Sequence, residues 1–112
     1  MNNLELSSFK IISSVGMAKS SYIEAMNAAE KGNFDLADEK IKEGEKFFSE
    51  GHEAHSGLIQ QESSGDDIKL SLLLMHAEDQ LMSAETIKIM AKEVIKLNNR
   101  CLLYTSPSPR DA

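Results

Sequence analysis

The chain has 112 residues, a length typical of one domain with one modest core. It has only two prolines and no tryptophan, and abundant Ala, Leu, Glu and Lys together with six methionines favour helices. The formal net charge of -6 argues against nucleic-acid binding, which needs a basic surface. An acidic surface instead suits contacts with basic patches on protein partners. The single cysteine, Cys101, excludes an internal disulfide.

No segment has the features of a membrane span or a targeting sequence. The longest apolar runs are far shorter than the ~18 residues that a transmembrane helix needs. The first six residues have neither the basic flank nor the apolar stretch of a signal peptide. We therefore expect a cytoplasmic protein without direct membrane insertion.

The first predicted helix covers residues 6–31. Its apolar positions follow a repeat close to 3.6 residues, as expected for one buried helix face. These positions are Phe9, Ile12, Val15, Tyr22, Met26 and Ala29. Gly32 follows as a residue that tolerates the left-handed conformation that commonly ends a helix.

The second predicted helix begins near Asn33 or Asp35, both good N-cap residues, and continues to about residue 62. The residues expected on its buried face are Phe34, Ala37, Ile41, Phe48, His55, Leu58 and Ile59. Three glycines, at positions 44, 51 and 57, weaken the helix. They indicate either a kink or a place where another part of the chain comes close.

A turn at residues 63–67 separates the second helix from a third, predicted over residues 68–97 with Asp66 or Asp67 as its cap. Three helices joined by two short turns predict an all-α, antiparallel up-down-up three-helix bundle. This single domain is expected to span residues 1–100. Residues 101–112 contain two Ser-Pro steps and are expected to form a disordered tail that is not native sequence.

The third helix is apolar on more than one side, although a helix in a three-helix monomer needs only one buried stripe. Residues at alternating spacings of four and three form the seam of a coiled coil: Leu72, Met75, Asp79, Met82, Thr86 and Ile89. Copies of the chain can therefore meet along this helix around a symmetry axis. A buried carboxylate at Asp79 would need protonation or a shared cation, unless it lies at the solvated end of the seam.

His76 directly follows the seam residue Met75, which places it at the edge of the expected interface. A neutral imidazole is a competent nucleophile near pH 7, because the ordinary pKa of histidine is about 6.5. Phosphoryl transfer to such a nitrogen needs in-line access and donors for the phosphoryl oxygens. From these residues alone, an ordinary helix histidine remains the simpler interpretation.

The string over residues 72–84 resembles the signature of the lactose/cellobiose-type IIA component of the bacterial sugar phosphotransferase system. That signature is an apolar run, then His-Ala-Gln-Asp and Leu-Met, which here reads His76-Ala77-Glu78-Asp79 followed by Leu81-Met82. The turn at residues 32–37 and the second helix around residues 53–62 are also similar to the family. The resemblance covers residues 9–100.

The resemblance implies a homotrimer in which His76 takes a phosphoryl group from HPr and passes it to a cysteine of the IIB component. The IIB component would then phosphorylate a β-diglycoside, of cellobiose, chitobiose or lactose type, that enters through the membrane IIC component. Asp79 would lie on the three-fold axis, where Mg²⁺ can bind. Glu78 stands where the family usually has Gln, and a carboxylate pointing into the phosphorylation groove would slow transfer. Gln80 is a candidate donor to the phosphoryl oxygens.

Other functions fit the sequence less well. The segment His52-Glu53-Ala54-His55 has its histidines three apart, not four as in the metalloprotease motif, and no Glu-x-x-His pair occurs. No Gly-rich phosphate loop is present, which argues against a nucleotide-dependent kinase. The main alternative is a non-catalytic oligomeric helical adaptor, in which His76 has no role.

Overall fold

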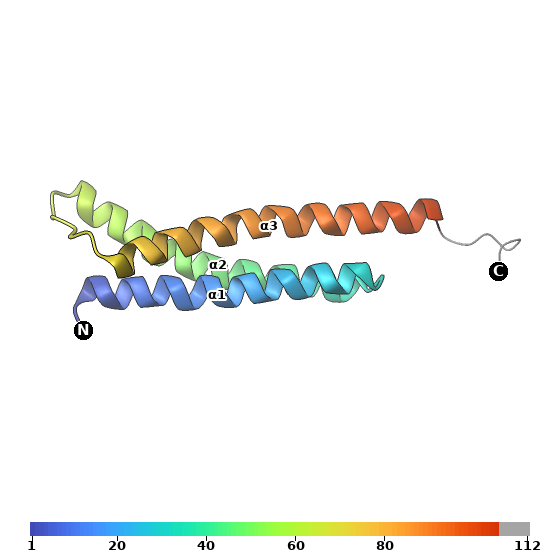
Figure 1. Cartoon of the computed structure of the whole chain (residues 1–112), viewed down its shortest axis with the longest axis horizontal. Helices are drawn as coiled ribbons and strands as arrows, with labels where there is room; N and C mark the ends of the chain where they lie inside the picture. Colours follow the sequence, from blue (N-terminus) through green and yellow to red (C-terminus); the bar gives the residue numbers. More distant parts are fainter. Residues whose placement is uncertain (106–112) are drawn as a thin grey trace, which may run out of the picture.

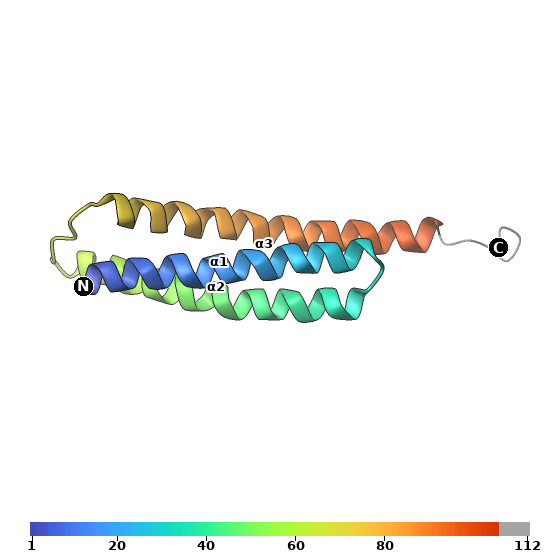
Figure 2. The same ribbon diagram turned by 60° about the horizontal axis from the view of Figure 1, so that its bottom comes forward.

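A computed structural model describes residues 1–105 of the chain as three helices. They are α1 (Asn3–Glu30), α2 (Phe34–Ser63) and α3 (Leu72–Thr105), and the described residues contain no strand. Successive helices run in opposite directions and lie side by side (Figures 1 and 2). The predicted all-α, up-down-up bundle is therefore confirmed.

Each helix begins where a short polar side chain accepts a hydrogen bond from the first turn. The side chain of Asn2 accepts from the backbone N–H of Glu5 at 2.8 Å, and Asn33 accepts from that of Leu36 at 3.2 Å. Asn33 is thus the N-cap of α2, as one of the two sequence alternatives predicted.

The predicted start of the third helix is wrong by four residues. Neither Asp66 nor Asp67 caps it, because the Oγ of Ser71 accepts from the backbone N–H of Leu74 at 3.1 Å and α3 starts at Leu72. Gly65, with φ of +102°, takes the left-handed conformation just after α2. The chain then crosses to α3 without helical structure through residues 66–71.

Helix α1 is the central element, because it packs against both other helices while α2 and α3 contact each other much less. Most of its inward residues are small, which lets both neighbours approach closely. The buried residues of α1 are Ser8, Ile11, Ser14, Val15, Ala18, Ser21, Tyr22, Ala25, Ala28 and Ala29.

Two residues predicted to face inward are exposed. Phe9 is 46% exposed, and the core position near it belongs to Ile11, which is fully buried. Ile59 is 49% exposed, because its neighbour Leu58 faces the core and consecutive helix residues are about 100° apart. The spacing pattern therefore identified the helices correctly but assigned one exposed residue to the buried face of α1 and one to that of α2.

Two of the three glycines of α2 mark a close approach to α1. A Cβ at Gly44 would lie 2.5 Å from Cε1 of Tyr22, and a Cβ at Gly51 would lie 2.7 Å from Cγ1 of Val15. At Gly57 a Cβ would meet nothing within 4 Å. The close-contact interpretation thus holds for Gly44 and Gly51.

Helix α3 continues past the expected boundary at residue 100. Residues 101–105 are helical, so the prediction of a disordered tail is wrong for them. Before the first proline, at position 107, these residues include nothing that stops a helix. The rest of the predicted tail lies outside the described residues. Along residues 1–105, no helix is long and apolar enough to cross a membrane.

Candidate functional site

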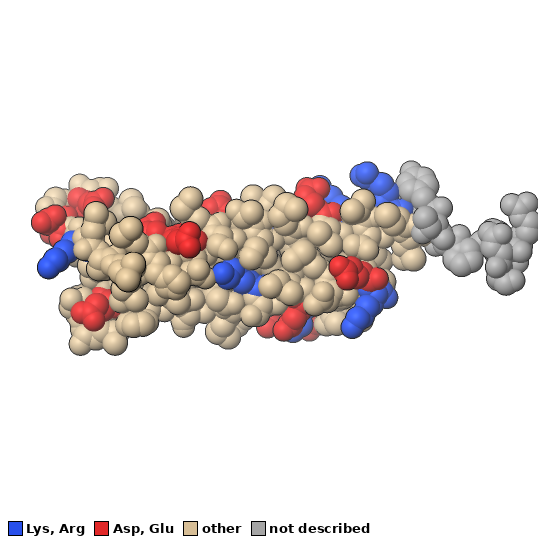
Figure 3. Space-filling model, viewed as in Figure 1, with Lys and Arg blue, Asp and Glu red and all other residues tan. Residues whose placement is uncertain are grey.

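The outward face of α3 is apolar and uncovered within the subunit. The apolar members of the predicted seam are strongly exposed, with Leu72 at 84%, Met75 at 58%, Met82 at 66% and Ile89 at 55%. The opposite face supplies the core residues Leu74, Ala77, Leu81, Ala84 and Ala91. The predicted second apolar face of this helix is therefore present. In the space-filling view, uncharged surface separates the scattered charged side chains (Figure 3).

His76 lies in the second turn of α3 and is exposed, beside this apolar face. At 100° per residue, its side chain is about 60° around the helix from Asp79, which is also exposed. Within residues 1–105, no hydrogen bond or ion pair engages the His76 imidazole. Both ring nitrogens are thus available to another molecule.

A lysine and a glutamine connect α1 to α3 one helical turn beyond His76. Nζ of Lys19 donates to Oε1 of Gln80 at 2.7 Å. This contact fixes the amide, whose N–H groups remain as the donors that Gln80 can offer. Sequence reasoning missed Lys19, because no local pattern pairs residues that are 61 positions apart.

Glu78 points to the α2 side of α3 and is held there by His55. Nε2 of His55 lies 2.7 Å from Oε1 and 2.8 Å from Oε2 of the Glu78 carboxylate. The His55 side chain is 20% exposed and that of Glu78 is 40% exposed. The structure therefore brings together two residues that sequence reasoning treated separately, and it turns Glu78 away from the flank on which His76 lies.

The two histidines of the segment 52–55 have different environments. The His52 ring stacks on Phe48, with centroids 6.1 Å apart, and the ammonium of Lys88 lies 4.7 Å from the centroid of the same Phe48 ring. Among residues 1–105, no three His, Cys, Asp or Glu side chains of one chain gather into a metal site. A cation at Asp79 would need several copies of the chain and stays a prediction.

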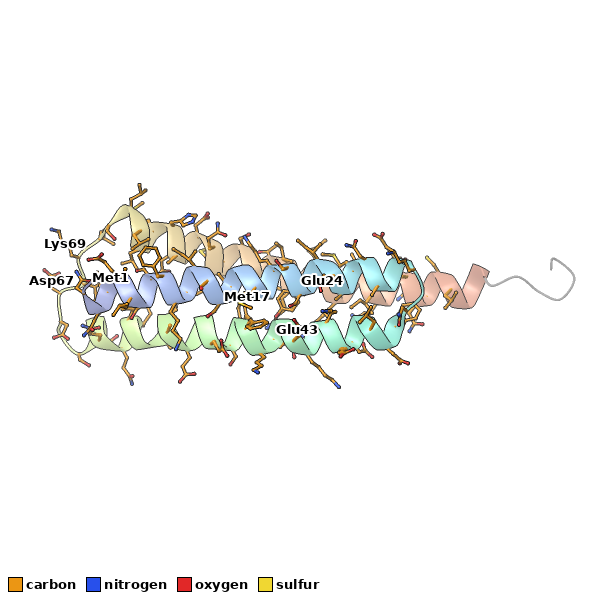
Figure 4. All side chains as sticks on the ribbon, turned by 90° about the horizontal axis from the view of Figure 1, so that it is seen from below. Met1, Met17, Glu24, Glu43, Asp67 and Lys69 are labelled. Atoms are coloured by element: carbon orange, nitrogen blue, oxygen red, sulfur yellow. The ribbon has the colours of Figure 1, made fainter. Side chains whose placement is uncertain are left out.

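A separate charged cluster joins α1 to α2 near their connecting turn. Figure 4 shows Glu24 on α1 and Glu43 on α2, and Nζ of Lys40 bonds their carboxylates at 2.8 and 3.2 Å. Hydrogen bonds to Glu24 and Glu43 raise the pKa of Lys40 above its ordinary value. This partly exposed cluster ties two helices together, and the raised pKa keeps the Lys40 amine protonated, so it is not a nucleophile at neutral pH.

Comparisons with known proteins agree with this fold and motif. The family described as PTS system, lactose/cellobiose specific IIA subunit, matches residues 6–99. The lactose-specific EIIA component of Streptococcus mutans is 38% identical over 92 residues, covering 82% of this chain and 88% of that protein. The oligo-beta-mannoside-specific EIIA component of Bacillus subtilis is 42% identical over 90 residues, covering 80% and 82%.

A solved structure with a similar fold supports the same family. The cellobiose-specific enzyme IIA from Bacillus anthracis superposes with a TM-score of 0.88 at 34% identity, and the match covers 96% of each chain. The molecule is therefore a IIA-type component of a sugar phosphotransferase system. It belongs to the lactose/cellobiose-specific IIA family, as the His76 motif predicted. IIA components relay phosphoryl groups in sugar transport, and their general partners are HPr and a IIB component.

Proposed function

We propose that this chain is a phosphohistidine carrier that accepts a phosphoryl group from HPr on His76 and passes it to a cysteine of the IIB component. Family membership supports a relay role, and one observation supports His76 as the acceptor. His76 is an exposed histidine within the family motif, with no contact inside the described chain that would occupy its imidazole.

The transfer chemistry needs little from the protein beyond access and placement. A neutral imidazole nitrogen of His76 attacks phosphorus, and the bond from phosphorus to the HPr histidine breaks as the new bond forms. In the second step the thiolate of the IIB cysteine takes the phosphoryl group and the His76 imidazole is released. Both partners must approach in line, which an exposed helix position permits. The amide N–H groups of Gln80, one turn away, are candidate donors to the phosphoryl oxygens.

We propose a β-diglycoside as the transported sugar. The matched relatives carry names that specify lactose, cellobiose and oligo-beta-mannoside. The relay itself handles a phosphoryl group and not the sugar, which enters through the IIC component. The substrate class is therefore taken from these relatives and not from any contact in this chain.

The assembly that we propose is a homotrimer formed along the outward face of α3. That face exposes apolar residues at coiled-coil spacing, and burying them would stabilise association. Asp79 lies within the same row and would meet its copies on the axis. Carboxylate oxygens are suitable ligands for Mg²⁺, so three Asp79 side chains could hold the ion, which would offset their mutual repulsion.

Phosphorylation by purified components tests the acceptor. Incubation with phosphoenolpyruvate, enzyme I and HPr should place one acid-labile phosphoryl group on each chain. His76→Ala should abolish labelling and leave the helical circular dichroism unchanged, because the residue is exposed. His52→Ala, which removes another exposed helix histidine, is the matched control and should be labelled normally. Labelling that survives His76→Ala would refute the assignment.

A further inference from the structure

The contact between His55 and Glu78 involves both carboxylate oxygens. Nε2 of the imidazole is nearly equidistant from them, at 2.7 and 2.8 Å, so one N–H is shared between two acceptors. The two residues come from α2 and α3, and both side chains are partly shielded from water. His55 therefore fixes the orientation of the Glu78 carboxylate as well as giving it a hydrogen-bond partner.

Glu78 matters to phosphoryl chemistry because it is only two residues from His76 on the same helix. Residues at this spacing point to different sides, so the held carboxylate does not face the His76 imidazole. Its charge still lies about 12 Å from that ring, given a rotation of about 160° between the two side chains and about 6 Å from the helix axis to each group. A phosphoryl group on His76 adds negative charge at this distance.

The surroundings of Glu78 determine where its carboxylate would go without His55. On the α2 side it borders a pocket of about 190 Å³ whose walls are mostly apolar and include Leu58, Leu74 and the carboxylate-bearing Glu62. Apolar walls do not stabilise an unpartnered charge, and Glu62 would repel it. A released Glu78 side chain would therefore turn towards solvent on its own flank of the seam, the flank that in the proposed trimer faces the His76 flank of a neighbouring copy.

We infer that His55 is a positioning residue for phosphoryl relay: it holds the Glu78 carboxylate against α2 and so keeps negative charge out of the phosphorylation groove. This inference rests on the proposed function. It explains how the chain tolerates a carboxylate where its family usually has an amide. The position of the Glu78 carboxylate matters more in the proposed trimer. There His76 and Glu78 flank the seam on opposite sides, where neighbouring helices face each other.

The equilibrium of phosphoryl exchange with HPr tests this inference in four proteins: the unaltered chain, His55→Ala, Glu78→Gln and the double variant. His55→Ala removes the N–H donor and should lower the equilibrium constant for forming the phosphorylated chain by about two- to fivefold. Moving a unit charge from about 12 to about 8 Å from a phosphoryl group with one or two negative charges, at an effective dielectric near 30, corresponds to this range. Glu78→Gln alone should leave the constant unchanged or raise it, because it removes a carboxylate. The double variant should match Glu78→Gln, since no carboxylate remains to be released.

Rescue by the second substitution separates positioning from simple structural support. If His55 only tied α2 to α3, removing Glu78 as well would not restore the equilibrium. A His55→Ala protein with the unaltered equilibrium constant, or one that Glu78→Gln fails to rescue, would overturn the inference. His55→Phe keeps an aromatic ring without an N–H donor; it is the second test variant and should lower the constant in the same way. If the unaltered chain accepts no phosphoryl group, the proposed function itself fails and this inference fails with it.

Discussion

Gly44→Ala tests how tightly α2 packs on α1. The added Cβ would lie 2.5 Å from Cε1 and 2.7 Å from Cδ1 of Tyr22, well inside the distances that real carbon contacts allow. The Tyr22 ring is fully buried and cannot easily give way. Overpacking of this kind costs about 1–3 kcal/mol, and alanine recovers about 1 kcal/mol through its higher helix propensity. We expect a net loss of up to about 2 kcal/mol in the free energy of unfolding.

Gly57→Ala in the same helix is the matched control. A Cβ there meets nothing within 4 Å, so the substitution should stabilise the protein by up to about 1 kcal/mol. Thermal unfolding followed by circular dichroism, at one fixed protein concentration, should rank Gly57→Ala above the unaltered chain and Gly44→Ala below it. Each kcal/mol corresponds to roughly 4–8 °C in Tm for a domain of this size. If both variants gained stability, the Tyr22 contact would not limit the packing of α2.

Two further predictions concern a buried phenol and the seam carboxylate. Burial, with a smaller effect from Glu45, raises the pKa of Tyr22 to about 12, so stability that depends on its neutral form is complete below pH 10 and lost as the pH rises through 12. The free energy of unfolding measured with urea should therefore fall more steeply between pH 10 and 12 in the unaltered chain than in Tyr22→Phe. Equal slopes of this free energy against pH in the two proteins would contradict the prediction. In the proposed trimer, Asp79→Leu would replace a costly buried charge with an apolar contact, so light scattering should show a trimer that is as stable or more stable. A monomeric unaltered chain would refute the trimer, whereas dissociation of only the variant would show that a cation helps to hold it together.

The sequence predicted the helices well because their signals are local. The apolar repeat, the N-cap Asn33 and the turn at Gly32, with φ of +78°, each act over a few residues. The start of α3 was missed because Asp66, Asp67 and Ser71 are all competent caps. Which of them is the N-cap depends on the path of the chain between α2 and α3, and no local sequence pattern predicts that path.

The candidate site was predicted in part for the same reason. The exposed apolar neighbours of His76 could be located from spacing along one helix, whereas His76 itself was singled out by the resemblance of its motif to a known family. The contacts that Glu78 and Gln80 make could not, because their partners lie 23 and 61 positions away. Which side chains meet across two helices depends on their relative rotation and axial register, and both are set by packing along the whole bundle.

The central position of α1 gives the bundle a preferred direction of opening. Helices α2 and α3 each pack extensively on α1 but little on one another. A swing of α3 away from α2, with α1 as the shared axis, therefore breaks fewer contacts than removal of α1 from the bundle. The backbone amides of α1 should exchange most slowly with solvent, and those facing the gap between α2 and α3 more quickly. The bundle thus behaves as two helices, α2 and α3, that are both attached to α1. The residues that link α2 to α3 influence how often these two helices separate.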